Sequence, residues 1–383
     1  MSSNTRKVNI ERLAEAVFCF TVFFAFLCPG FSFGTDIQPY ALIFAVVVIF
    51  LNFRSRIPKS FVELSVLFLS VAMVVFFLSI LLGASPFECV RSLLNYVSVS
   101  IIPIATFFYL QARNGLNELF IKICLLVWLA FALVQMFISK DIGSFLLADM
   151  RTSDSRGVNS LFNEPSFYGY SCIFALIIVQ TFKRHRWIFT GILIVELVFF
   201  AASAVSAIYL VIGVVAVCCC QLTHVKIRTV VIIIVGFIVA VGFSWVLMTY
   251  FPDMRITRLM VTATTDFSAL LTDQSISERL DAIYQSIYLF LSNGTLPSLF
   301  QGHRIMSGYG SFLVDFGVIG LVAIIGIFVI LLKGFPVKGG FAFAVAVTVT
   351  AMMFSAVQLS SPLFSFVLGL CMWHISYSKP RKN

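Results

Sequence analysis

Long apolar runs separated by short polar segments repeat along most of the chain. They lie near residues 13–34, 38–53, 61–83, 93–112, 119–138, 165–182, 188–222, 229–250, 309–332, 339–358 and 361–377. A helix needs about 20 apolar residues to cross about 30 Å of hydrocarbon. Most of these runs therefore predict one membrane-spanning helix each, and together they predict an all-α polytopic membrane protein.

The run at 188–222 is too long for a single crossing, because as one helix it would measure about 52 Å. We divide it at Ala201–Ala202–Ser203 into two short spans. With this division, the expected number of transmembrane helices is about 12.

Composition agrees with this interpretation. Hydrophobic residues make up 60% of the 383 positions and charged residues only 11%, a balance that excludes a soluble fold. The net charge of +9 fits the excess of Lys and Arg on the cytoplasmic side of membrane proteins, and nothing outside the spans indicates nucleic-acid binding. The nine cysteines include no CxxC pair, so neither a disulfide framework nor a zinc site is indicated.

The positions of the basic residues orient the predicted spans. With the N-terminus inside, the outer segments hold, of the 26 lysines and arginines, only Arg91, Lys140, Arg151, Arg156, Arg255, Arg258, Arg279 and Arg304. If 188–222 were one helix, the later basic segments, including the C-terminal KPRKN, would face outward against the positive-inside tendency. Both termini are therefore expected on the cytoplasmic side.

Two segments between the predicted spans are long, 139–164 and 251–308, and both are expected on the outer side. Long loops of this kind are usually functional. No period of 20–50 residues repeats, so residues 1–383 are expected to form a single integral membrane domain that carries these two large loops.

The second outer loop contains a predicted amphipathic helix near residues 276–292. Leu280, Ile283, Ile287 and Leu291 recur there at helical spacing and would form one apolar face. Ser275 and Glu278 have the spacing of a capping box at its start. A helix of this kind could lie on the membrane surface.

The first outer loop ends in the stretch RGVNSLFNEPSFYGYS, which leads directly into an apolar run. Pro165 suits the first position of a helix, where its missing N–H is not needed. Glu164 would then lie at the positive end of the helix dipole, which favours the ionised carboxylate. Such a carboxylate could act as a general base, or it could merely cap the helix.

Arginine is the other residue type that points to chemistry on the outer side. Arg151, Arg156, Arg279 and Arg304 are candidates for binding a diphosphate, because guanidinium groups make bidentate contacts with phosphate oxygens. Each could instead contact lipid headgroups or water. His303 is a second candidate for the catalytic base. No motif supports a catalytic metal, and no cofactor is expected.

Charge inside the predicted spans is scarce apart from Glu196. An intramembrane carboxylate is a functional candidate by default, although it could equally pair with a polar residue of a neighbouring helix. The concentration of polar residues in the outer loops favours chemistry at the membrane surface over transport.

Three stretches resemble bacterial O-antigen polymerases (Wzy) of the O-antigen ligase-like superfamily. RGVNSLFNEPSFYGYS is similar to the Arg-Gly…Glu-Pro-Ser stretch that opens a span after an outer loop. The arginine-bearing late loop and GHRIMSGYGSFLVDFGVIG, a Gly-His…Gly segment before a Gly-x-x-Gly span, complete the resemblance. Ligases of the superfamily tend to show Asn soon after this His, whereas Gly308-Tyr309-Gly310 occupies the region here.

The resemblance implies a membrane glycosyltransferase that joins repeat units carried on undecaprenyl diphosphate into long lipopolysaccharide chains, without a metal. Glu164 and His303 would be the catalytic candidates, and Arg156, Arg279, Arg304 and Arg151 would bind the diphosphate. Donor and acceptor would both be lipid-linked oligosaccharides, with membrane lipid, a chain-length regulator and a flippase as further partners. The enzyme would reside in the bacterial inner membrane with its active site facing the periplasm.

Three alternatives remain open at this point. An O-antigen ligase would share the fold and the donor but use another acceptor. A polymerase of a different surface polysaccharide would share the whole chemistry. A flippase or other transporter of lipid-linked oligosaccharides would not be an enzyme, and such proteins usually show internal repeats and charged or broken helices at the midplane.

Overall fold

The computed structural model of the chain is built from helices. It describes residues 3–28, 39–52, 56–144, 147, 150, 157–221, 242, 245, 248–250, 252, 255–266, 274–293, 297, 305, 307–337, 340–355 and 357–377. Every regular element in these ranges is helical, which confirms the all-α prediction for them.

The first part of the bundle consists of five helices: α1 (Ser3–Leu27), α2 (Pro39–Leu51), α3 (Lys59–Leu81), α4 (Pro86–Ala112) and α5 (Glu118–Phe137). Of the helices in the described ranges, α3, α4 and α5 are long and apolar enough to cross a membrane. Exposed apolar side chains run along the whole of α3, among them Leu64, Leu67, Val74, Phe77 and Leu81. An apolar surface along a whole helix is typical of a face that contacts lipid or another protein.

The middle of the chain forms α6 (Pro165–Val179), α7 (Arg186–Val195), the π-helix η1 (Glu196–Phe200) and α8 (Ala204–Gln221). The helix that begins at Arg186 ends at Phe200, and Ala202 adopts a left-handed conformation with φ of 43° before α8 begins. The predicted break at Ala201–Ala202–Ser203 is thereby confirmed as a break between two helices.

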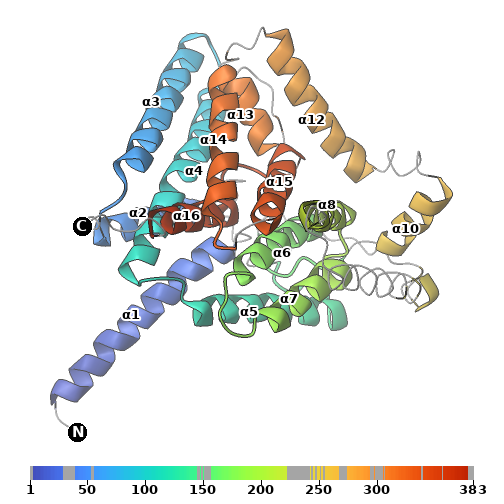
Figure 1. The fold of residues 1–383 in the computed structure, drawn as a ribbon, viewed down its shortest axis with the longest axis horizontal. Helices are drawn as coiled ribbons and strands as arrows, with labels where there is room; N and C mark the ends of the chain where they lie inside the picture. The colour runs from blue at the N-terminus through green and yellow to red at the C-terminus, as the bar shows by residue number, and fades with distance from the viewer. Residues whose placement is uncertain are drawn as a thin grey trace.

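The C-terminal part contains α13 (Gly308–Phe316), α14 (Val318–Gly334), α15 (Gly340–Ser355) and α16 (Pro362–Tyr377). The expectation of one continuous helix over 309–332 is wrong, because Gly317 breaks it with φ of 57° and ψ of −130°. The two helices then pack against each other (Figure 1). A conformation of this kind is open to glycine and strained for other residues.

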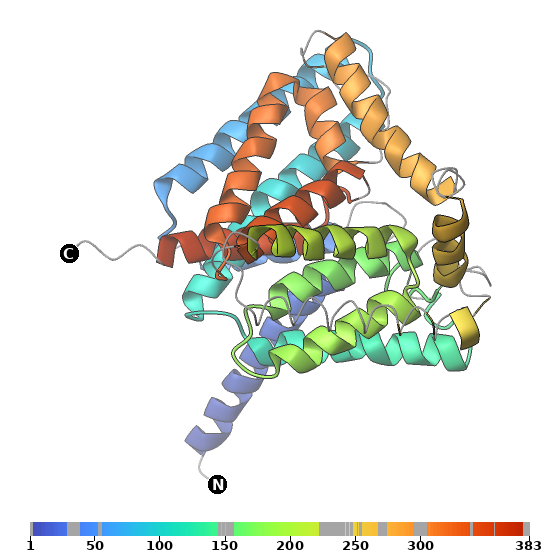
Figure 2. The same cartoon turned by 45° about the vertical axis from the view of Figure 1, so that its right-hand side comes forward.

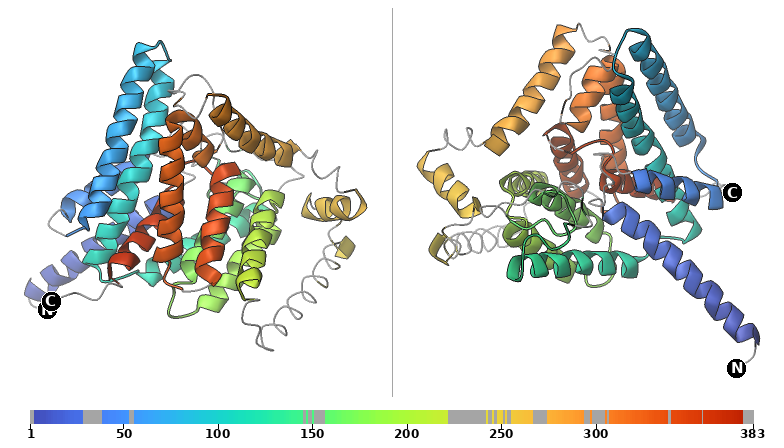
Figure 3. Two further views of the ribbon diagram at one scale, coloured as in Figure 1. Left: turned by 45° about the horizontal axis from the view of Figure 1, so that its top comes forward. Right: turned by 180° about the vertical axis from the view of Figure 1, so that it is seen from behind.

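The late outer loop supplies two helices, α10 (Arg255–Thr265) and α12 (Gln274–Ser292). Helix α12 confirms the predicted helix near 276–292, but it begins one residue before the predicted cap at Ser275. It packs against α13 and α15, while α10 contacts α8 (Figures 1 and 2). In the left view of Figure 3, α12 lies obliquely beside the helices of the bundle.

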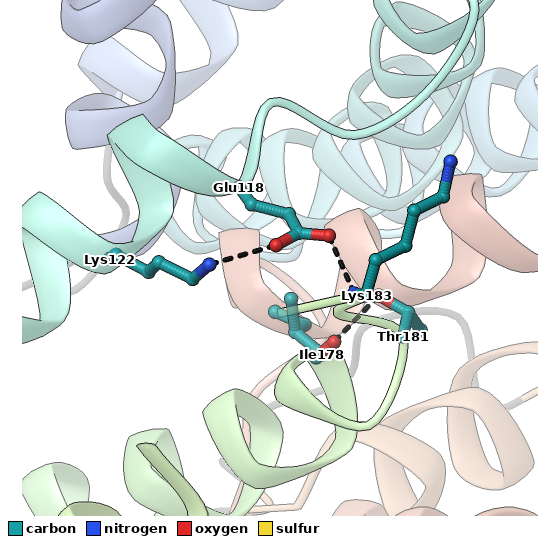
Figure 4. Close-up of polar contacts among 5 residues, drawn as sticks. All are labelled: Glu118, Lys122, Ile178, Thr181 and Lys183. Carbon is teal, nitrogen blue, oxygen red and sulfur yellow. Dashed lines mark hydrogen bonds and ion pairs between the residues drawn. The ribbon is translucent and has the colours of Figure 1, made fainter. Parts of the chain in front are cut away.

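A polar cluster at the N-terminal end of α5 joins this helix to the turn between α6 and α7. The Glu118 carboxylate accepts a hydrogen bond from Lys122 Nζ at 2.8 Å and another from the Lys183 backbone N–H at 2.6 Å (Figure 4). The Lys122 ammonium also lies 5.0 Å from the centre of the Phe182 ring. Because these charges satisfy one another, we regard the cluster as structural.

Candidate functional site

The segment before α6 is buried and held by backbone contacts. Its Val158 N–H donates to the Phe200 carbonyl at 2.7 Å, at the end of the π-helix. Gly157 lies so close to this helix end that a Cβ atom would overlap the carbonyl oxygens of Phe200 and Ala201. Close packing therefore explains why the second residue of the Arg-Gly pair, at position 157, is a glycine.

Gln135 of α5 holds the next turn of the same segment. Its side-chain oxygen accepts from the Ser160 N–H at 2.6 Å, and its Nε2 donates to the carbonyls of Ser160 and Ile142 at 2.9 and 2.8 Å. The Ser160 hydroxyl donates to the Trp128 carbonyl at 2.7 Å. These bonds fix Ser160 in a left-handed conformation with φ of 51°. Because the buried backbone groups here are satisfied, the segment enters α6 along a defined path.

Glu164 is the last residue before α6, with Pro165 at the predicted first helical position. Its backbone is extended and its carbonyl accepts the first helical bond, from the Tyr168 N–H at 3.1 Å. Its carboxylate accepts no N–H of the helix and instead accepts a hydrogen bond from the Ser166 hydroxyl at 3.1 Å. The interpretation of Glu164 as a side-chain cap is therefore wrong.

Arg279 reaches the same region from α12. The guanidinium of Arg279 and the carboxylate of Glu164 both lie within electrostatic range of Tyr170, one turn into α6. Arg279 also interacts with Tyr209 of α8, whose ring centre is 6.0 Å from that of Tyr170. The structure thus brings together one residue from each of the two predicted outer loops, although they are far apart in sequence.

The hydrogen bonding of this cluster is incomplete. The Tyr209 hydroxyl pairs with the Ser355 hydroxyl at the end of α15. By contrast, the guanidinium of Arg279 lies beside the Tyr170 hydroxyl, but neither this hydroxyl nor Arg279 Nε makes a well-formed hydrogen bond to a described residue, although both atoms are buried. Buried donors without an acceptor are uncommon in folded proteins, and here two of them come from different helices, α6 and α12, and meet in one cluster.

The other predicted site residues, Arg151, Arg156, His303 and Arg304, lie outside the described residues. Glu164 and Arg279 are therefore the two predicted residues whose positions the structure gives. Tyr170 and Tyr209 were missed by sequence reasoning, because a tyrosine near the start of an apolar run carries no signal that separates it from core aromatic residues.

Two carboxyl groups lie within the core, away from this cluster. Glu196 is fully buried in η1, where its Oε2 accepts a hydrogen bond from the Cys172 thiol of α6 at 3.8 Å, while its Oε1 has no hydrogen-bond partner among the described residues. Asp315 of α13 accepts a hydrogen bond from the Tyr96 hydroxyl of α4. The predicted spans therefore hold a second carboxylate besides Glu196. Sequence reasoning missed Asp315 because it is a single charged residue within an apolar run.

Among the described residues, no three His, Cys, Asp or Glu side chains gather in a group that could hold a metal ion. The described functional groups of the cluster are a carboxylate, a guanidinium and two phenols. Comparison of the chain with protein-family models, with characterised proteins and with solved structures yields no match.

Proposed function

We propose that the chain is a polysaccharide polymerase of the bacterial inner membrane that uses lipid-diphosphate-linked donors. Glu164 takes the proton of an acceptor hydroxyl, and that oxygen forms the new bond to the anomeric carbon of the donor glycan. The bond from this carbon to the diphosphate oxygen breaks, and undecaprenyl diphosphate leaves with the electron pair. Attack opposite the leaving group inverts the anomeric centre.

The observation that carries the proposal is the meeting of Glu164 and Arg279 at Tyr170. A diphosphate is already a competent leaving group, so the protein needs only to stabilise its developing negative charge. Arg279 supplies the positive charge that stabilises it, and the carboxylate of Glu164 makes no cap hydrogen bond to α6. The general base and the phosphate-binding group therefore come from two different segments, and they act on the acceptor hydroxyl and on the diphosphate of the donor, respectively.

The membrane arrangement supports the same assignment. The N-terminal ends of α6 and α13 lie at the end of the bundle where α15 terminates, since the Gly308 N–H donates to the Val357 carbonyl and Ser355 contacts Tyr209. In the proposed twelve-span topology this end faces the periplasm. A lipid-linked substrate would then present its diphosphate at the level of the cluster while its tail stays in the bilayer.

The decisive test is the glycan ladder of cells in which this chain is replaced by variants. Glu164→Gln removes the base with little change in shape, and we expect chain elongation to fall by about 100-fold or more. Only single repeat units would then be attached to the lipid acceptor, while the membrane level of the protein stays unchanged.

Glu88→Gln is the matched control, because Glu88 is exposed and lies in the first turn of α4, which also begins with a proline. We expect this variant to give a normal ladder. A normal ladder for Glu164→Gln would remove Glu164 from the mechanism. In cells that lack the chain, complete loss of attached glycan would indicate a ligase, and accumulation of inward-facing lipid-linked units would indicate a flippase.

A further inference from the structure

Tyr170 and Arg279 each place a buried hydrogen-bond donor in the same region without an acceptor. Tyr170 is 3% exposed, and its hydroxyl lies beside the Arg279 guanidinium without a well-formed hydrogen bond to a described residue. Arg279 Nε lacks one as well. The two side chains come from α6 and α12, so this pairing depends on the docking of α12 and not on a local turn.

We propose that Tyr170 and Arg279 together form a binding site for the oxygen atoms of a phosphate group, with the Tyr170 hydroxyl as a donor alongside the guanidinium. This inference rests on the proposed function, in which Arg279 binds the diphosphate, and adds a residue that the sequence motifs do not identify. The Tyr170 side chain contacts the ligand directly.

The chemistry of the donors selects the class of ligand. A guanidinium Nε–H and a phenol O–H can both donate to one anion, and hydrogen bonds to ionised acceptors are about twice as strong as neutral ones. A neutral sugar hydroxyl would leave the charge of Arg279 uncompensated, because Arg279 forms no ion pair with any described residue. A phosphate supplies several acceptor oxygens and the compensating charge.

Tyr209 is not the second donor, although it also lies near Arg279. Its hydroxyl is already paired with Ser355, and its ring packs against Tyr170. Tyr209 therefore holds the Tyr170 ring in place. Glu164 also lies near Tyr170, and its negative charge would repel a phosphate, whereas the guanidinium of Arg279 would attract one. The phosphate is thus expected at the Arg279 side of the phenol.

The test measures binding to the full chain in nanodiscs of zwitterionic lipid. Farnesyl diphosphate serves as the phosphate probe and farnesol as the neutral probe. Tyr170→Phe keeps the ring and removes the donor, so we expect the Kd for farnesyl diphosphate to rise about tenfold while the Kd for farnesol is unchanged. An unchanged Kd for farnesyl diphosphate, or an equal loss for both probes, overturns the proposal.

Tyr309→Phe is the control, because Tyr309 is also fully buried with an unpartnered hydroxyl, but it packs among Phe312, Phe354 and Phe364. We expect it to bind both probes normally.

Full competition by phosphatidylglycerol in the nanodisc would assign the site to a phospholipid headgroup and overturn the proposal. If Tyr170→Phe weakens diphosphate binding but Glu164→Gln leaves the glycan ladder intact, the phosphate site stands and the proposed reaction falls.

Discussion

At the scale of single residues, the position of Glu164 depends on the packing of the segment before it. The carboxylate receives no N–H from its own helix, so its place depends on the path of residues 157–164 and on the hydrogen bond from the Ser166 hydroxyl. That path is fixed at one end by Gly157 against the π-helix and in the middle by Gln135. A general base must lie within hydrogen-bond reach of the proton it takes, so these contacts matter for catalysis.

Gly157→Ala is expected to disturb this path. The added methyl group would overlap the backbone oxygens of Phe200 and Ala201, which cannot rotate away as a side chain would. Forced overpacking of this kind typically destabilises a protein by about 1–3 kcal/mol. We expect a lower apparent melting temperature of the purified protein and shorter glycan chains, because the segment carrying Glu164 must shift.

Gly191→Ala provides the comparison, since Gly191 lies inside α7 with open space where its Cβ would be. Alanine is favoured over glycine in a helix by about 0.5–1 kcal/mol, so this variant should be as stable as the original chain or more so. Equal melting temperatures for the two variants would show that Gly157 is not tightly packed.

At the scale of elements, the features that could be predicted are those that the length of an apolar run or the local residue types indicate. The run 188–222 is too long for one span, and the break at Ala201–Ser203 follows. Pro165 marks the start of α6, and the spacing of Leu280 and Ile287 marks α12. The break at Gly317 leaves no such mark, because the run 309–332 has the length of a single span and a glycine inside it is common in membrane helices.

The candidate site divides in the same way. Glu164 and Arg279 could be predicted because charges are conspicuous in an apolar chain. Tyr170 could not, because its role depends on the docking of α12 against α13 and α15, which no local pattern of residues specifies.

Gly317→Ala tests whether glycine is needed for the sharp turn between α13 and α14. The φ of 57° and ψ of −130° are strained for any residue with a Cβ, at a cost of about 1–3 kcal/mol. We expect a measurable drop in the apparent melting temperature. Gly326→Ala, at an open position inside α14, should cause none, and a drop of the same size there would mean that the turn is not the cause.

At the scale of the whole molecule, α5 separates the candidate site from the cluster around Glu118. Glu118 opens this helix and Gln135 lies near its end, and α5 is about 30 Å long, which matches the hydrocarbon thickness. Helix α6 is arranged in the same way: Glu164, in the candidate site, precedes its first residue, and the turn with Lys183, which contacts Glu118, follows its last residue. If α5 crosses the membrane, the site and the Glu118 cluster lie on opposite sides of it.

Cysteine labelling in intact cells tests this arrangement. Ser144 and Arg184 are exposed and lie near the site and near the Glu118 cluster, respectively. In a chain whose partly exposed Cys218, Cys219 and Cys220 are replaced by serine, a membrane-impermeant maleimide in the periplasm should label Ser144→Cys. It should label Arg184→Cys only after the inner membrane is permeabilised. The reverse pattern would place Glu164 on the cytoplasmic side, where a polymerase acting on exported repeat units could not use it. Labelling of both positions in intact cells would show that α5 does not cross the membrane.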